Sequence, residues 1–341
     1  MSGGSEEQAG APRGLNRGLR RRGPRALALA VAAAALGAVA VTQASAGAHP
    51  SAGSGAAGRG GPTARAAAKP GTGKPTVVIG DKNFEEENLL GALYAKALHD
   101  QGYKVVLKPN VGSTEIIYKA LTSGKIGMYP EYTGTLLSTI AGQTKNPASA
   151  KAAYNEAKAY VEKHGLTMLA ETPFYDADAL AVLPSYAKEN HLTSISQLKA
   201  LGKKVTMGGA PEFQTRYEGL IGLKKAYGVV PSFKPISIEL SYKALESGQV
   251  NVQEVFTTDG QLLGGKFKVL SDPKHIFGYQ NVAPIVSKKV ATEEGPAFAQ
   301  TLNKVSALLT IKAIQQMNAA ITIDKQSAAK VADEFLKANG L

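Results

Sequence analysis

Two aromatic residues occupy equivalent places in an internal repeat, where both could contact one ligand. Residues 113–133 align without gaps on residues 237–257, nine of the 21 positions are identical, and Tyr132 falls opposite Phe256. Each aromatic stands near the predicted carboxyl end of a strand, which is where open α/β sheets bind ligands. The repeat therefore predicts two similar lobes that each contribute one ring to a shared site. The alternative is a chance likeness of two amphipathic helices, and it is weakened because the match continues to the final threonine.

An arginine follows a glycine-rich segment between the two copies of the repeat. Residues 204–207 read as a strand, and Gly208-Gly-Ala-Pro-Glu-Phe-Gln-Thr-Arg216 leads from it to a helix-like stretch that ends near Tyr227. A helix start and a nearby guanidinium together provide donors for an anion. Arg216 is therefore a candidate for binding an anionic group of a ligand. The alternative is a solvated or purely structural arginine.

The chain lacks the residue sets of metal, redox and nucleophilic chemistry. It has no cysteine, and its five histidines form neither a His-x-x-x-His pair nor a His-Glu-x-x-His motif. Ser185 and Lys188 satisfy a Ser-x-x-Lys pattern, but the Ser-Asp-Asn and Lys-Thr-Gly motifs that accompany it in penicillin-recognising enzymes are missing from the sequence. We therefore expect no catalytic residue, no metal and no cofactor, and an exported hydrolase is the least favoured function.

The elements that must position these residues form an α/β pattern. In each copy of the repeat, a helix over Tyr-Lys-Ala-Leu is stopped by Gly124 or Gly248, and a strand follows at residues 126–128 or 250–255. Upstream, a short apolar strand from Val77 to Ile79 precedes a helix and a second strand at residues 105–107. That helix has leucine, tyrosine and alanine at helical spacing from Leu89 to Leu98. We assign Tyr118 and Tyr242, inside the repeated helices, to the core, and leave Tyr129 open between core and site.

The first 75 residues predict an export signal and a tether. Arg20 to Arg25 precede an apolar run from Ala26 to Val41, and Ala44-Ser-Ala46 follows as a cleavage pattern. We expect cleavage after residue 46; the alternative is an uncleaved membrane anchor, and either places the body outside the cytoplasm. Residues 47–75 are rich in Gly, Ala and Pro, which predicts a flexible linker. The net charge of +12 lies mostly in these two segments, so the nearly balanced body is not expected to bind nucleic acid.

From residue 76 onward the chain resembles the osmoprotectant-binding proteins, which are the extracytoplasmic substrate-binding components of ABC importers for glycine betaine, choline, carnitine and related quaternary amines. Five segments carry the resemblance: Gly80-Asp-Lys-Asn-Phe-Glu-Glu-Glu-Asn88, Gly112-Ser-Thr-Glu115, Tyr129-Pro-Glu-Tyr-Thr-Gly-Thr135, Pro211-Glu-Phe-Gln-Thr-Arg216 and Thr258-Asp-Gly260. The resemblance implies a two-lobed type II periplasmic-binding-protein fold with the ligand cleft between the lobes. We place the crossings near 180–183 and 282–287, so that lobe 1 comprises 76–181 and 282–341 and lobe 2 comprises 182–281.

The resemblance also implies roles for individual residues. In the family, aromatic rings surround a quaternary ammonium, and basic and hydroxyl groups hold the ligand's carboxylate. Tyr132 and Phe256 match or occupy positions of the aromatic cage, Arg216 matches the carboxylate-binding arginine, and the positions that assist it correspond to Lys82 and Thr135. Thr135 favours betaine-like zwitterions over choline, because its hydroxyl can donate to a carboxylate.

Two departures from the family pattern imply an incomplete cage. Asp178 stands where the family usually has a cage tyrosine, and Tyr279 is displaced by one position near the second crossing. A carboxylate at Asp176 or Asp178 could replace the lost ring attraction by pairing directly with the ligand's charge. A polyamine or amino acid is therefore the alternative ligand, because an ammonium with N–H groups profits from carboxylates.

The function that the resemblance implies is solute capture without catalysis. A monomeric binding protein closes its lobes on the ligand and delivers it to the transmembrane permease subunits, which a cytoplasmic ATPase powers.

Overall fold

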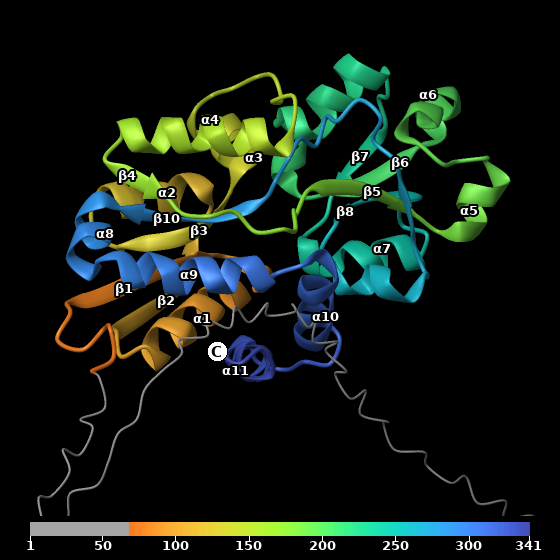
Figure 1. Cartoon of the computed structure of the whole chain (residues 1–341). Helices are drawn as coiled ribbons and strands as arrows, with labels where there is room; N and C mark the ends of the chain where they lie inside the picture. Colours follow the sequence, from red (N-terminus) through yellow and green to blue (C-terminus); the bar gives the residue numbers. More distant parts are fainter. Residues whose placement is uncertain (1–67) are drawn as a thin grey trace, which may run out of the picture. The chain divides into compact units, whose positions relative to one another are not determined.

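The structure, a computed structural model, describes residues 68–341, which form an α/β body with two five-stranded sheets (Figure 1). The predicted leader at 1–46 and the linker as far as residue 67 lie outside the described residues. The first sheet has, in spatial order, β2 (Lys104–Gly112), β1 (Thr76–Lys82), β3 (Met128–Tyr132), β10 (Val282–Ser287) and β4 (Leu166–Met168). The second has β7 (Ser232–Pro235), β6 (Thr206–Gly209), β8 (Val252–Phe256), β5 (Asp178–Val182) and β9 (Lys268–Leu270).

The two sheets have the same topology, as the repeat predicts. In the first, β1 is parallel to β2 and β3, whereas β10 is antiparallel to β3 and β4. In the second, β6 is parallel to β7 and β8, whereas β5 is antiparallel to β8 and β9. The copies of the repeat form α2 (Thr114–Thr122) with β3 and α7 (Ser241–Glu246) with β8. Both strands begin two residues later than predicted, and each ends on its aromatic residue.

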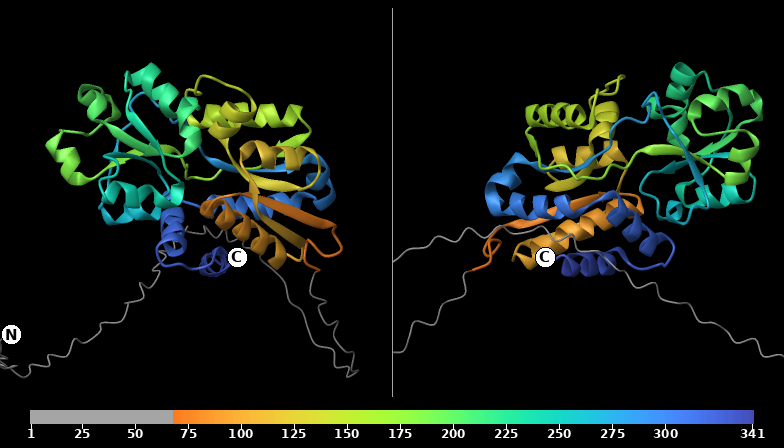
Figure 2. Two further views of the ribbon diagram at one scale, coloured as in Figure 1. Left: turned by 180° about the vertical axis from the view of Figure 1, so that it is seen from behind. Right: turned by 45° about the vertical axis from the view of Figure 1, so that its right-hand side comes forward.

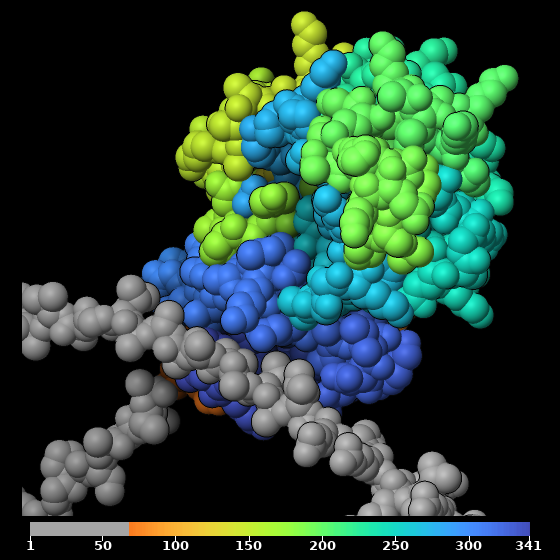
Figure 3. All heavy atoms as spheres, turned by 90° about the vertical axis from the view of Figure 1, so that its right-hand side faces the viewer, coloured from red at the N-terminus to blue at the C-terminus, as the bar shows by residue number. Residues whose placement is uncertain are grey.

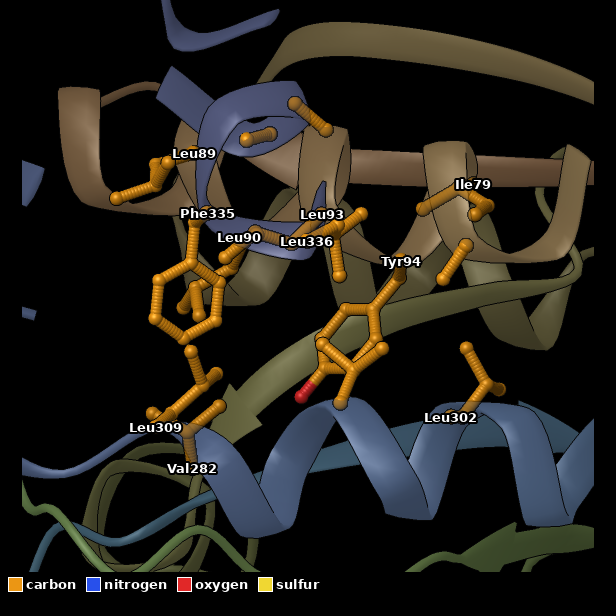
Figure 4. Close-up of a cluster of buried hydrophobic side chains, with 14 of the residues drawn as sticks. Ile79, Leu89, Leu90, Leu93, Tyr94, Val282, Leu302, Leu309, Phe335 and Leu336 are labelled. Atoms are coloured by element: carbon orange, nitrogen blue, oxygen red, sulfur yellow. The ribbon is translucent and has the colours of Figure 1, made fainter. Parts of the chain in front are cut away.

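The first sheet is covered by α1 (Glu85–Asp100), whose apolar face meets the sheet and the C-terminal helices. Leu89, Leu93 and Leu98 are fully buried, and a buried leucine stabilises the fold by about 1.5–3 kcal/mol. Figure 4 shows Tyr94 among these buried side chains. Its hydroxyl shares a hydrogen bond of 2.9 Å with Ser306. The predicted strand, helix and strand at the start of the body are therefore confirmed.

The remaining elements connect these strands and cover the sheets. The other α-helices are α3 (Thr133–Thr135), α4 (Ala150–Lys163), α5 (Pro184–Glu189), α6 (Leu198–Leu201), α8 (Lys288–Glu294), α9 (Pro296–Leu308), α10 (Ile311–Thr322) and α11 (Ala328–Ala338). Short 3₁₀ turns are η2 (Ile195–Gln197), η3 (Gly202–Lys204), η4 (Pro211–Gln214), η7 (Ile238–Leu240) and η8 (Gly260–Gly264). Wider π-helical turns are η1 (Leu136–Ile140), η5 (Tyr217–Ile221) and η6 (Leu223–Tyr227). Among residues 68–341 we find no helix with the length and apolar character needed to cross a bilayer.

The C-terminal helices return to the first sheet, and one of them also reaches the second. α11 packs on α1 (Figure 2), and α10 contacts both α1 and η8. The contact with η8 requires glycine, because a Cβ at Gly260 would lie 2.5 Å from the backbone of Ala319. In Figure 3 the C-terminal segment accordingly lies directly against the part of the chain that carries the second sheet.

Three predicted boundaries are wrong. The linker does not extend to residue 75, because Gly71 N–H donates to Gln101 O at 2.9 Å and Lys74 Nζ donates to Glu293 O at 2.8 Å. The first crossing does not lie at 180–183, because residues 178–182 already pair with β8 and β9 in the second sheet. The chain therefore passes between the sheets before Asp178. The second crossing does not lie at 282–287, because these residues pair with β3 and β4, so the chain has returned to the first sheet by Val282.

Candidate ligand-binding site

The ring of Tyr132, at the carboxyl end of β3, is held from several sides. The residue is 4% exposed, and its hydroxyl donates to Glu86 Oε1 at 2.8 Å. The Phe84 ring lies 6.0 Å away between centroids. The ammonium of Lys82 lies 4.7 Å from the centroid of the Tyr132 ring, so this ring already interacts with a cation of the chain itself.

Lys82 is itself part of a buried ion pair. Its ammonium binds Glu131, and both side chains are almost completely buried. Glu131 also accepts from the Tyr132 backbone N–H and from the Tyr129 hydroxyl, each at 2.7 Å. Tyr129, left open by the sequence, is fully buried and serves this carboxylate. The charge of Lys82 is therefore already balanced within the protein, although its ammonium has N–H donors beyond the one that Glu131 accepts.

Thr135 also has a partner within the chain. Its backbone N–H and its hydroxyl both donate to Gln280 Oε1, at 2.8 and 3.2 Å. The side chain of Gln280 also packs on Gly134, where a Cβ would lie 2.8 Å from the amide. Both donors of Thr135, the last residue of α3, are therefore taken up by a glutamine from the segment that precedes β10.

The backbone of Tyr279 is bound to the segment of Tyr132 and Thr135, because Thr133 Oγ1 donates to Tyr279 O at 3.0 Å, but its ring has other partners. Its ring stacks on that of His275, 6.0 Å away between centroids, and its hydroxyl donates to Ala148 O at 3.5 Å. It lines a pocket of about 300 Å³, and Tyr132 and Arg216 do not line that pocket.

Asp176 belongs to a hydrogen-bonded chain that includes Tyr132. Thr258 Oγ1 donates to Asp176 Oδ1 at 2.8 Å. Asn318 Nδ2 donates both to Thr258 O at 3.0 Å and to Glu86 Oε2 at 2.8 Å, and Glu86 in turn accepts from Tyr132. Burial raises the pKa of Asp176 well above its ordinary value, and the charge of Glu86 raises it further. Asp176 and Tyr132 are thus brought into one network that joins the two sheets through α10.

Asp178 begins β5 directly opposite Phe256, and it forms a carboxyl pair with Glu254. The two side chains project from the same side of adjacent antiparallel strands and come within hydrogen-bonding reach. Burial raises the pKa of Asp178 to about 6, and burial and the charge of Asp178 raise the pKa of Glu254. Gly209 permits this approach, since a Cβ there would lie 2.5 Å from Glu254 Oε2. Two carboxyl groups in contact hold a proton between them.

Arg216 and Phe256 are the predicted residues that have the fewest partners. Arg216 lies between η4 and η5, half-buried, and its charge lowers the pKa of Asp178 and of Glu115. Within residues 68–341, no group accepts a hydrogen bond from the Arg216 guanidinium or forms an ion pair with it. Phe256 is half-buried, and its backbone N–H donates to Asp259 Oδ2 at 2.9 Å. Both side chains remain available to a ligand.

Sequence reasoning missed the partners that hold these residues in place. They are Glu86, Glu131, Glu254, Gln280 and Asn318. Glu86 and Glu131 lie inside motif segments, so their proximity to the candidate residues was a usable signal. No pattern in the sequence marks Gln280 or Asn318, which reach the site only through the tertiary fold.

Comparison with known proteins gives a consistent result. A family model described as the substrate-binding domain of ABC-type glycine betaine transport systems matches residues 75–338. The glycine-betaine-binding protein of Pseudomonas aeruginosa is 32% identical over 278 residues, which cover 78% of this chain and 88% of the relative. The glycine betaine-binding protein YehZ of Escherichia coli is 30% identical over 279 residues, 77% of this chain and 90% of the relative.

Solved structures agree with this result. The crystal structure of a glycine betaine/carnitine/choline ABC transporter superposes with a TM-score of 0.67 at 26% identity, covering 77% of this chain and 98% of that one. Ligand-free YehZ from E. coli superposes with a TM-score of 0.61 at 30% identity, covering 78% of this chain and 99% of that one. The fold is the type II periplasmic-binding-protein fold that the sequence predicts.

Proposed function

This chain belongs to the family of substrate-binding domains of ABC-type glycine betaine transport systems, and on that premise we propose that it captures a quaternary ammonium osmoprotectant for import. The observation that carries the proposal is the equivalence of the two sheets. The equivalent strands β3 and β8 end on Tyr132 and Phe256. A trimethylammonium group has no N–H to donate, so the faces of aromatic rings are its natural partners.

The expected affinity needs no covalent chemistry. Each ring contributes about 0.5–2 kcal/mol, and a charge-assisted hydrogen bond from Arg216 to a carboxylate contributes about 1.5–3 kcal/mol. Exclusion of water on lobe closure strengthens both contributions, so that a dissociation constant near micromolar, about −8 kcal/mol, is reasonable. We accordingly propose that the protein catalyses no reaction.

The proposal includes its partners and location. Family members bind a small ligand and deliver it to a permease, and we propose that this protein does so as a monomer on the outer side of the cytoplasmic membrane. The signal-like pattern at residues 20–46 supports export.

The decisive experiment is parallel calorimetric titration of the purified protein with glycine betaine, choline, carnitine, proline betaine, putrescine and arginine. We expect micromolar binding of quaternary amines and weak or no binding of putrescine and arginine. A second candidate, a polyamine or amino acid, is favoured by the carboxyl groups at Asp176 and Asp178. Binding of putrescine or arginine without any quaternary amine would establish that candidate and overturn the first.

Arg216→Ala is expected to weaken glycine betaine binding at least tenfold, because Arg216 is the basic residue best placed for the ligand's carboxylate. Choline, which has no carboxylate, should lose much less affinity. Calorimetry with both ligands measures the difference, and Lys188→Ala, which removes an exposed positive charge on α5, serves as the matched control. Unchanged betaine binding in the Arg216 variant would remove Arg216 from the site.

Phe256→Tyr is expected to preserve or improve binding of a quaternary amine, whereas Phe256→Ala should weaken it about threefold to tenfold through the lost ring face. Titration measures affinity, and thermal unfolding of the same samples measures stability. A Phe256→Ala protein that binds the quaternary amine normally but unfolds at a much lower temperature would assign the ring to core packing.

A further inference from the structure

The groups expected to hold a ligand's carboxylate are mostly engaged within the protein. Lys82 is paired with Glu131 in a buried ion pair, and the hydroxyl and N–H of Thr135 both donate to Gln280. Recruiting the Thr135 hydroxyl to a ligand breaks its hydrogen bond to Gln280. Lys82 keeps further N–H donors, but its charge is already balanced by Glu131 and its side chain is almost completely buried. Arg216 alone among the predicted anion-binding residues remains available.

Carboxyl groups outnumber cations around the same residues, and burial raises the pKa values of Asp176, Asp178 and Glu254, so that a bound cation would favour their ionised forms. Asp178 lies directly opposite Phe256 in the sheet. Burial is the main cause that raises its pKa; the hydrogen bond with Glu254 and the charge of Arg216 lower that pKa, and the charges of Glu218 and Glu212 raise it. Asp176 faces Glu86 and Asp259, whose charges both raise its pKa, and Thr258 donates to it.

The acceptors of this region also exceed its donors. Asn318 is 6% exposed and donates its amide nitrogen to Glu86 and Thr258, but its Oδ1 accepts no hydrogen bond from residues 68–341. Glu86 is likewise buried and has neutral partners, Tyr132 and Asn318. A ligand that brings positive charge therefore improves the electrostatic balance, whereas a ligand that brings an additional carboxylate does not.

We propose that this site prefers a quaternary amine with a net positive charge, of the choline type, over a zwitterion of the betaine type. The inference rests on the proposed function, since it concerns the selectivity of that same site. It reverses the preference for zwitterions that Thr135 suggests from the sequence, because the Thr135 hydroxyl is bonded to Gln280. Asp178, with Glu254 beside it, is the residue that determines this selectivity.

Choline and glycine betaine form a matched pair for the test, because both carry the same trimethylammonium group. Choline has a hydroxymethyl group where glycine betaine has a carboxylate. We expect calorimetry at pH 7.5 to give choline an affinity at least tenfold higher, about the contribution of one charge interaction. Equal affinities or tighter binding of betaine would overturn this inference and leave the proposed function standing. Failure of both ligands to bind would overturn the proposed function itself.

Asp178→Asn removes the charge and keeps the shape of the side chain. We expect it to weaken choline about tenfold while betaine binds equally well or better, so that the ratio of the two affinities falls. Asp324→Asn makes the same change in net charge at an exposed position and should leave the ratio unchanged. If Asp178→Asn also leaves the ratio as in the wild type, Asp178 does not determine selectivity. Because the readout is a ratio, a general loss of folded protein does not imitate the expected result.

Discussion

Replacement of Lys82 by methionine is expected to lower the free energy of unfolding by about 3–5 kcal/mol, because it leaves the buried Glu131 carboxylate without its cation. The aliphatic part of Lys82 is retained by methionine, so lost packing is a minor cause. The hydrogen bonds from Tyr129 and from the Tyr132 backbone remain, but they do not replace a full positive charge. Chemical denaturation followed by circular dichroism measures the change.

Two further variants separate charge burial from a general effect of losing a lysine. Lys96→Met removes a partly exposed pair with Asp100 and should cost less than about 1 kcal/mol. The double variant Lys82→Met with Glu131→Gln should recover much of the lost stability, since no unpaired buried charge then remains. A Lys82→Met protein as stable as the wild type would show that Glu131 is not held by Lys82.

Asp81→Asn is expected to stabilise the protein, increasingly so as the pH rises. Asp81 in β1 is fully buried, and neither carboxylate oxygen accepts a hydrogen bond from residues 68–341. The side chain is pressed against α1, where a Cβ at Gly91 would lie 1.9 Å from Asp81 Oδ1. Burial raises the pKa of Asp81 from 3.8 to about 8, so the folded protein favours the protonated form.

The direction of the pH effect follows from proton linkage. Between pH 4 and pH 8 the folded state holds the Asp81 proton and the unfolded state does not, so this residue lowers stability as the pH rises. Asparagine does not titrate. Its advantage over the wild type should therefore be near zero at pH 4 and should reach several kcal/mol, at most about 5, by pH 8.

Thermal and denaturant unfolding of both proteins at pH 5, 6.5 and 8 would measure this difference. Asp324→Asn, at an exposed position, should give a difference that does not depend on pH. An advantage of Asp81→Asn that is constant over the range would contradict a protonated, buried Asp81 and would indicate that its carboxyl group finds a polar partner.

Most of the fold could be predicted from the sequence because its signals are local. The apolar run at residues 77–79, the helical spacing from Leu89 to Leu98 and the repeated helix and strand depend on periodicities that a short window contains. The repeat even predicted that both sheets would place an aromatic at a strand end. The boundaries failed where partners are distant: the pairing that assigns residues 178–182 to the second sheet involves β8 and β9, about 70 to 90 residues further along the chain.

For the candidate site, the sequence by itself determined which residue types are present and which family they resemble, because motifs and repeats are properties of the chain order. Only the tertiary structure decided which of those side chains are free to meet a ligand. Lys82 binds Glu131, which is 49 residues away in the sequence, and Thr135 binds Gln280, which is 145 residues away. Tyr279 lines a pocket that Tyr132 and Arg216 do not line. Whether a charged or polar group is available depends on which partners the fold brings within hydrogen-bonding distance, and that distance is not encoded in local spacing.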